Sequence, residues 1–320
     1  SPEIDSLICA TDSGREGELI FRYIYDITKC KKPFERLWIS SMTEEAIKEG
    51  FATLKDGREY DLLYSSAKCR SEADWLVGMN ATRAYTLRYD ALLSIGRVQT
   101  PTLALIVNKQ KEIDAFVAED YFEVQADFGG YTGMWIDKEE HTRIEKEETA
   151  KEIAAKVSGK QATITKVEKE EKKMPPPLLY DLTELQRDCN KKFGFSAKKT
   201  LDIAQNLYEK RKMITYPRTD SRYLSDDMKG KVHNTLRRLN ELAEYQPYTQ
   251  PLSGNISFTK RIIDNSKVTD HHAIIPTDGR LRVDNLTEEE KKVFSMVAAR
   301  FLSVFYPYYR YETTKVYAEA

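Results

Sequence analysis

The stretch "SLICATDSGREGELIFRYIYDI", Ser6 to Ile27, joins a short apolar run to a helical pattern through a polar turn. The run ending at Ala10 has the length and composition of one buried strand. After the turn, apolar side chains recur at helical spacing: Leu19, Ile20, Tyr23, Ile24 and Ile27. The same order returns in "RLWIS" and a helix expected from Thr43. Alternating strands and helices predict an α/β unit with a parallel sheet.

Beyond this unit the hydrophobic period changes several times. Residues 60–116 are mostly helical in pattern, whereas "YFEVQADF", "TGMWID" and "QATITKVE" alternate like strands. A Lys- and Glu-rich run, Lys166–Lys173, leads into three prolines, which make a stiff extended spacer and indicate a hinge or a domain entry. Further helices are expected at 181–193, 197–210, 226–245 and 288–305, with a strand in "YYRYETTKVYAEA". The fold class is therefore multidomain α+β.

Composition bounds the function classes. The chain has 320 residues, with 50 Lys plus Arg against 51 Asp plus Glu, a net charge of −1. A nucleic-acid-binding protein with this balance must segregate its charge onto one face. No apolar run approaches the ~18 residues of a membrane span. The four cysteines form no Cys-x-x-Cys motif and the N-terminus has no signal-peptide pattern, which favours the reducing cytoplasm.

The turn "ATDSGREGE" places two carboxylates at the expected strand end. Asp12 lies at the carboxyl edge of the strand, where ligand sites of α/β sheets are found. Glu16 follows in the first turn of the helix. Such a pair suits Mg²⁺, which usually takes one or two carboxylates together with waters and phosphate. Alternatively, both acids simply stabilise the positive end of the helix.

Two other segments carry polar groups that suit phosphate. "SIGRVQTPT" puts Arg97, Gln99 and Thr100 at a helix start, which is either a phosphate seat or an ordinary helix start. "DHHAIIPT" puts His271 and His272 on a loop. A histidine there donates to phosphate or shuttles a proton, binds metal with a partner not near in sequence, or is structural.

"KMITYPRTDS" contains a phenol next to a cation. Tyr216 has an ordinary pKa near ~10 and is a poor nucleophile at pH 7 without help. Arg218 is placed to bind a phosphate under attack and to stabilise the charge that develops on it. This pattern matches attack on a phosphodiester. The alternative is that Tyr216 is one more packed tyrosine among 19.

Taken together, these motifs resemble the type IA DNA topoisomerases. "ATDSGREGELIFR" is similar to the acidic turn of their Toprim domain, and "RSEADWLVGMNATRA" with "SIGRVQTPTLALIV" to their helical DNA-binding region. "LTELQRDCNKKFGFSAKKTLDIAQNLYEKRKMITYPRTDS" and "HHAIIPT" resemble their active-site domain. The resemblance implies a partial Toprim domain (1–60), a helical domain (61–118), a β-rich arch (119–174 and 278–320) and an active-site domain (175–277).

The resemblance also implies roles for single residues. Tyr216 is the nucleophile that joins to a 5′-phosphate, Arg218 the adjacent catalytic arginine, and His271 an assisting residue. Asp12 and Glu16 are the Mg²⁺ carboxylates, with Glu16 also counted among the catalytic residues. The expected DNA-binding residues are Arg70, Asp74, Arg97, Gln99, Thr100, Thr219 and Asp220.

Two departures from the family pattern stand out. Many members have a second aspartate where this chain has Gly14, so metal binding is expected to be weaker or to use Glu18 or an absent residue. The family's first strand, with a catalytic glutamate and a lysine, has no counterpart here, and the arch is cut short. We therefore expect an internal piece of a longer protein that has little or no cleavage activity alone.

The leading interpretation is a cytoplasmic, nucleoid-associated topoisomerase that cuts and reseals one strand. Its expected partner is single-stranded DNA. It needs neither ATP, since no P-loop is present, nor a membrane. The sequence does not determine the oligomeric state; a monomer is the simplest expectation. The alternatives are a non-catalytic single-strand-binding module and, more remotely, a Toprim primase or nuclease.

Overall fold

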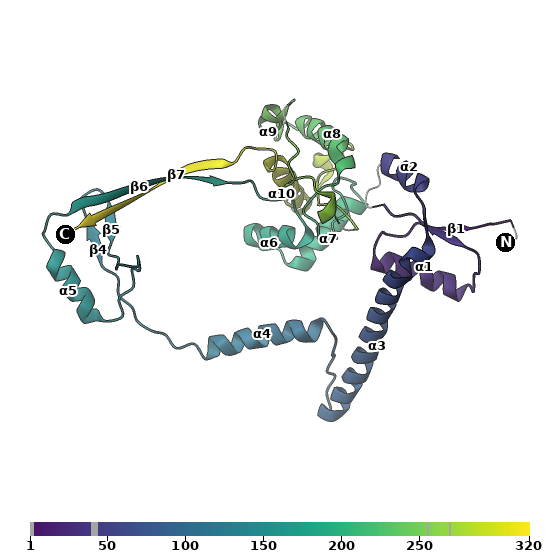
Figure 1. The fold of residues 1–320 in the computed structure, drawn as a ribbon, viewed down its shortest axis with the longest axis horizontal. Helices are drawn as coiled ribbons and strands as arrows, with labels where there is room; N and C mark the ends of the chain where they lie inside the picture. The colour runs from purple at the N-terminus through teal and green to yellow at the C-terminus, as the bar shows by residue number, and fades with distance from the viewer. Residues whose placement is uncertain (1–2, 40–43, 255, 269) are drawn as a thin grey trace. The chain divides into compact units, whose positions relative to one another are not determined.

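The computed structural model describes residues 3–39, 44–254, 256–268 and 270–320 (Figure 1). The chain divides into two compact units. The first comprises the residues through Trp75 together with Met174–Tyr309, and the second comprises Leu76–Lys173 with Arg310–Ala320. The finer division into four domains stays a prediction.

The N-terminal part of the first unit is a small mixed sheet. Strands β1 (Leu7–Cys9) and β2 (Phe34–Arg36) are parallel and are connected by α1 (Arg15–Ile27), as the sequence predicts. The strand expected in "RLWIS" begins earlier and ends at Arg36. A third strand, β3 (Lys55–Asp56), pairs antiparallel with β2 after α2 (Glu44–Ala52). The predicted helix start at Thr43 lies outside the described residues.

A pair of short helices forms the centre of the other part of this unit. Helix α6 (Leu182–Phe193) begins at Asp181, whose carboxylate accepts from the Glu184 backbone N–H at 2.7 Å. It ends at Gly194 in the left-handed region (φ 70°), where glycine is the favoured residue. Helix α7 (Ala197–Glu209) begins at Ser196, whose hydroxyl caps it. Both predicted helices are confirmed. They could be predicted because the residues that begin and end them lie next to them in the sequence.

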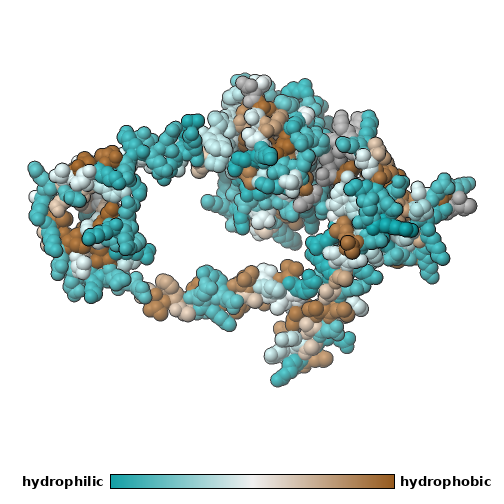
Figure 2. Space-filling model, viewed as in Figure 1, coloured by the Kyte–Doolittle hydropathy of each residue, from teal (hydrophilic) through white to brown (hydrophobic). Residues whose placement is uncertain are grey.

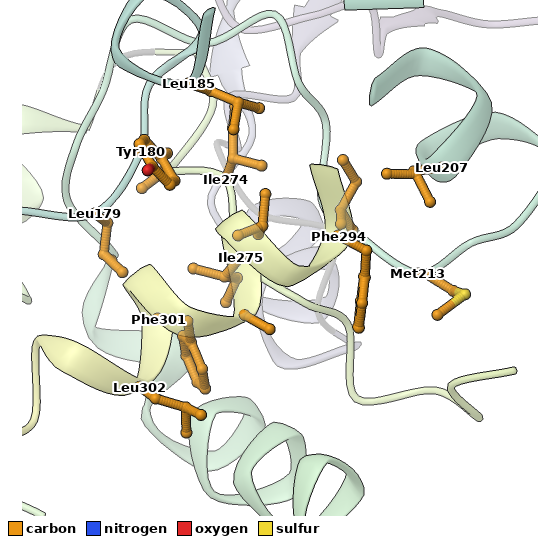
Figure 3. Packing of buried hydrophobic residues seen from close by; sticks show 14 of the residues in the cluster. Leu179, Tyr180, Leu185, Leu207, Met213, Ile274, Ile275, Phe294, Phe301 and Leu302 are labelled. Carbon is orange, nitrogen blue, oxygen red and sulfur yellow. The ribbon is translucent and has the colours of Figure 1, made fainter. Parts of the chain in front are cut away.

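The hydrophobic core of the first unit lies around α10 (Glu288–Ser303), which packs on α6 and α7. Figure 3 shows Phe294 and Phe301 of α10 close to Ile274 and Ile275 of the neighbouring loop. All four are almost fully buried. The other elements here are α8 (Lys229–Asn240), α9 (Gln246–Thr249) and short 3₁₀ turns at Asp226–Met228, Gln250–Leu252, Asn265–Lys267 and Val283–Asn285.

Helix α3 (Asp61–Tyr89), preceded by a 3₁₀ turn at Gly57–Tyr60, continues from the first unit into the second. The second unit contains α4 (Gln99–Asp114), the antiparallel hairpin of β4 (Gln125–Asp127) and β5 (Thr132–Met134), and α5 (Glu147–Val157). A two-stranded sheet joins β6 (Thr163–Met174) to β7 (Tyr309–Glu319).

The Lys- and Glu-rich run belongs to a strand, and the three prolines that follow it lie just inside the first unit, next to its boundary with the second. The run lies inside β6, where charged side chains from both strands face water and pair with each other, as Lys169 does with Glu312 at 3.2 Å. A solvated two-stranded ribbon needs no apolar face, so its sequence looks like a linker.

The apolar stripe of α4 is exposed in the part of the chain that the structure describes. Leu103 is 59% and Ile106 63% accessible, and Figure 2 shows hydrophobic side chains on the surface of this helix. Among the described residues, no helix has both the length and the apolarity that a membrane crossing requires.

Candidate active site

A buried arginine holds the turn that follows β1. The Arg36 guanidinium, which is 0% exposed, donates through Nη1 to the carbonyl oxygens of Cys9 (3.0 Å) and Thr11 (2.8 Å). Its Nη2 donates to the Asp12 carbonyl at 2.5 Å. Its Nε lies 3.0 Å from Glu18 Oε2. The backbone of Asp12 is thus held by the buried Arg36 side chain, while the Asp12 side chain is exposed.

Close packing of the helix against this turn requires a glycine at position 17. A Cβ there would lie 2.1 Å from the Asp12 carbonyl oxygen, which no side chain tolerates. The Gly14 N–H donates to the same oxygen at 2.9 Å. The turn therefore presents Asp12 at the positive end of α1.

Glu18 is not available as a metal ligand. Its carboxylate is fully buried and forms ion pairs with Arg36 (3.0 Å) and with Arg22 (2.8 Å). The expectation that Glu18 replaces the aspartate absent at Gly14 is therefore wrong. A buried carboxylate held between two guanidinium groups has no free face for a cation.

Replacing Arg36 by methionine is expected to destabilise the N-terminal sheet by about 3–5 kcal/mol, the usual cost of removing one partner of a buried ion pair. Protection of residues 3–39 in hydrogen exchange would measure the loss. Glu35→Gln changes an exposed charge on the same strand and should stay within about 0.5 kcal/mol of wild type. Equal protection in both variants would show that Arg36 does not hold the turn.

The Tyr216 segment is bound along its length to the His271 loop. The Thr215 N–H donates to the Ile275 carbonyl at 2.9 Å, and the Thr215 hydroxyl donates to the Ala273 carbonyl at 3.1 Å. The hydroxyl of Thr219 donates to the His271 carbonyl at 3.0 Å. Two threonines flanking the tyrosine thus determine which loop residue faces it. Thr219 is buried, and its predicted contact with DNA stays a prediction.

The Tyr216 ring is half-buried between two other rings. The His271 ring centroid lies 4.3 Å away and the Tyr208 centroid 5.4 Å away in an edge-on arrangement. The neighbouring His272 is half-buried, with its Nδ1 2.8 Å from the Ala273 carbonyl oxygen, and burial lowers its pKa. The structure therefore places His271 beside the Tyr216 ring, and its assisting role stays a prediction.

Arg218 is exposed two residues beyond the tyrosine. With its amide oxygen turned toward the guanidinium, Gln205 of α7 accepts from Arg218 Nε (3.3 Å) and Nη2 (3.2 Å). Sequence reasoning missed Gln205. The available signal was the helical spacing that puts Gln205 and Tyr208 on one face of the helix leading to the tyrosine.

The strand end and the tyrosine line one pocket of about 580 Å³ within the first unit. Asp12, Tyr216 and His271 are among its lining residues, together with Asp270, which the sequence analysis did not single out. Partial burial, and then the charges of Asp220 and Asp12, raise the pKa of Asp270 against the opposing effect of His271. The pocket therefore holds carboxylates beside a phenol and an imidazole, together with the cations of Lys212 and Lys231.

The predicted carboxylate Glu16 is highly exposed and lies 3.5 Å from Nη1 of Arg70, which comes from α3. Asp74, one turn further along α3, is also exposed. The predicted DNA contact Arg70 is thus adjacent to a predicted catalytic carboxylate. The metal role of Glu16 stays a prediction.

The other predicted DNA-binding residues belong to the second unit. Helix α4 begins at Gln99, as the sequence predicts, with Val98 as its N-cap and Arg97 one residue earlier. The Thr100 hydroxyl accepts from the Gly96 N–H at 3.1 Å, which closes the turn before the helix. Their role in binding phosphate stays a prediction.

The donor set fits a weakly held Mg²⁺. Across the described ranges, no three His, Cys, Asp or Glu side chains come together as a ready-made metal cage. Magnesium needs few protein ligands, because it keeps several waters and binds phosphate oxygens directly. Exposed carboxylates lining the pocket, such as Asp12 and Asp270, are of the right chemistry.

Comparison with known proteins supports one family. A family model described as DNA topoisomerase matches residues 58–320. DNA topoisomerase 3 of Bacillus subtilis is 47% identical over 322 residues, covering 99% of this chain and 44% of that protein. The Bacillus cereus DNA topoisomerase 3 is 48% identical over 312 residues and is covered to 43%. Full-length topoisomerase I from Thermotoga maritima is structurally similar, with a TM-score of 0.67 and 27% identity, covering 95% of this chain and 49% of that one. The chain thus spans less than half the length of these relatives.

Proposed function

Because the chain belongs to the type IA DNA topoisomerases, we propose that it carries the nucleophile and part of the acidic site of an enzyme that changes DNA topology through a transient single-strand break. The observation that supports this most directly is the single pocket lined by Asp12, Tyr216 and His271. Asp12 lies 204 positions before Tyr216 in the sequence, and His271 lies 55 positions after it.

The proposed reaction is a transesterification. The Tyr216 hydroxyl loses its proton and its oxygen attacks a backbone phosphorus, forming a phosphotyrosine bond to the 5′-phosphate. The bond from phosphorus to the 3′-oxygen breaks, and that oxygen takes up a proton. Reversal reseals the strand after another strand has passed. One phosphoester replaces another, so no ATP is consumed.

The residues around the tyrosine have distinct proposed tasks. Arg218 binds the phosphate under attack and stabilises its developing charge. His271 holds the phenol ring by ring contact and is placed to donate to phosphate. Asp12, with Glu16 in the next turn, would hold Mg²⁺, which neutralises phosphate charge when bound.

We propose the family arrangement for the finer organisation: a Toprim unit up to about residue 60, a helical DNA-binding region, a β-rich arch and an active-site domain. We also propose that the enzyme acts on cytoplasmic DNA as a monomer. Its preference for relaxation or decatenation is a property to be measured on the full-length protein.

The experiment uses full-length protein and a single-stranded oligonucleotide labelled at its 3′ end. Denaturation with detergent should leave the label on the protein, because attachment is to the 5′-phosphate of the downstream piece. Digestion and mass spectrometry should place the nucleotide on Tyr216. Label that stays with free DNA, while native gels show a complex, would mean binding without chemistry.

Single-strand binding should be strongly salt-dependent, since log K falls by about 0.7 for each phosphate contact as log salt rises. Arg97→Ala should make the slope of log K against log salt shallower by about 0.7, the value of one phosphate contact. Lys109→Ala, on the same helix but paired with Glu112 at 2.8 Å, should leave it unchanged. Fluorescence anisotropy at several salt concentrations measures both. Equal slopes in the two variants would remove Arg97 from the interface.

A further inference from the structure

The close approach of Asp270 to Gly14 distinguishes this site. An ideal Cβ built on Gly14 would lie 2.3 Å from Asp270 Oδ2, 2.5 Å from Oδ1 and 2.6 Å from Cγ. The carboxylate of Asp270 thus occupies the space that a side chain at position 14 would fill. Both residues belong to the first unit.

Backbone conformation does not explain the glycine. Gly14 is extended, with φ −167° and ψ 180°, a conformation that any residue adopts. Its position is the N-cap of α1, where aspartate is among the preferred residues. An aspartate would therefore suit the backbone here, and the space that its side chain would need is taken by Asp270.

From this geometry we propose that Asp270 supplies, from the loop that carries His271, the carboxylate that position 14 does not, and that Asp270 and Asp12 together hold the divalent cation of the proposed reaction. This inference rests on the proposed function and deepens it. It adds Asp270 to Asp12 and Glu16 as a ligand of the cation and ties cation binding to the loop that carries His271.

Three observations support the assignment. Asp270 and Asp12 line the same pocket and are both exposed, so a hydrated cation can reach them. The carboxyl group of Asp270 fills the space beside Gly14, in the same turn that carries Asp12. Glu18, the other acid considered for this role, is buried between two arginines.

The inference also gives the loop a role. Thr219 and Thr215 tie the His271 loop to the tyrosine segment, so a cation held by Asp270 and Asp12 would link the strand end of β1 to the nucleophile. In that arrangement, Asp270 and Tyr216 would face the same phosphate from a loop and a segment that are already hydrogen-bonded together.

The test measures Mn²⁺ binding to full-length protein without DNA, by electron paramagnetic resonance, in a set of charge-matched variants. Asp270→Asn should weaken the affinity for Mn²⁺ at least about tenfold. Loss of a group that only supports a metal ligand already costs about this much, and loss of a ligand should cost no less. Asp12→Asn should do the same. Asp278→Asn removes a carboxylate from the same pocket and should leave the affinity unchanged.

The decisive variant transplants the carboxylate. Gly14→Asp alone should not improve Mn²⁺ binding and should lower the thermal stability, because two carboxylates compete for one space. Gly14→Asp combined with Asp270→Gly should restore the affinity that Asp270→Asn loses. The inference is overturned if Asp270→Asn changes only the melting temperature and the double variant binds Mn²⁺ no better than Asp270→Asn does. Asp270 would then be an anion that stabilises the start of the helix.

This outcome is separable from failure of the proposed function. If Asp12→Asn weakens Mn²⁺ and Asp270→Asn does not, the inference about Asp270 fails while the strand-end site stands. If neither variant changes Mn²⁺ affinity, the cation does not bind at this pocket and the inference is overturned. The proposed nucleophile is tested independently, because the adduct on Tyr216 is identified by mass spectrometry.

Discussion

Full-length protein carrying Tyr216→Phe is expected to form no covalent adduct with single-stranded DNA under conditions in which wild type retains the 3′ label. The substitution removes the hydroxyl oxygen that acts as the nucleophile in the proposed reaction. It keeps the ring that lies 4.3 Å from His271 and 5.4 Å from Tyr208, so packing should be preserved. DNA affinity, measured by anisotropy, should stay close to that of wild type.

Tyr223→Phe is the matched control. Tyr223 is half-buried in the same segment, and its hydroxyl accepts from Lys267 Nζ at 3.3 Å rather than lining the pocket. This variant should form the adduct as wild type does. Persistence of the adduct in Tyr216→Phe would show that another of the 19 tyrosines is the nucleophile.

Local signals explain what the sequence predicted correctly. Helices α6 and α7 were predicted closely because Asp181, Gly194 and Ser196 mark their ends by chemistry that acts within four residues. The strand, turn and helix that end in α1 were predicted for the same reason. The change from a short apolar run to helical spacing and the two glycines of the turn lie next to one another in the chain. Tyr216 and His271 were singled out by their motifs.

Long-range packing explains what was missed. Nothing near Gly14 in sequence indicates that its space is filled by Asp270, because the two residues meet only through the fold. Gln205 carries no signal of its contact with Arg218 until α7 is placed beside the tyrosine segment. The exposed apolar stripe of α4 is a further case. The helical spacing of its apolar residues predicts an apolar face, but it does not predict which part of a protein covers that face.

The second large effect is expected at Arg218. Arg218→Ala should slow cleavage by roughly 10²–10³-fold, which is the usual loss when one preorganised donor to a developing negative charge is removed. The side chain is exposed, so the substitution leaves no buried cavity and the fold should persist. Single-turnover cleavage of a 3′-labelled oligonucleotide at saturating protein separates this rate from DNA affinity.

Comparison of three variants tests whether geometry or charge matters. Arg218→Lys should recover only part of the rate, because lysine keeps the charge but loses the planar pair of donors. Gln205→Ala should slow cleavage less than Arg218→Ala, since it frees the guanidinium that Gln205 contacts at 3.2–3.3 Å without removing it. Arg237→Ala, at an exposed site on α8, should cleave as wild type does. A cleavage rate in Arg218→Ala equal to that of Arg237→Ala would mean that charge stabilisation at the phosphate comes from another group, and Arg218 would then be a DNA contact only.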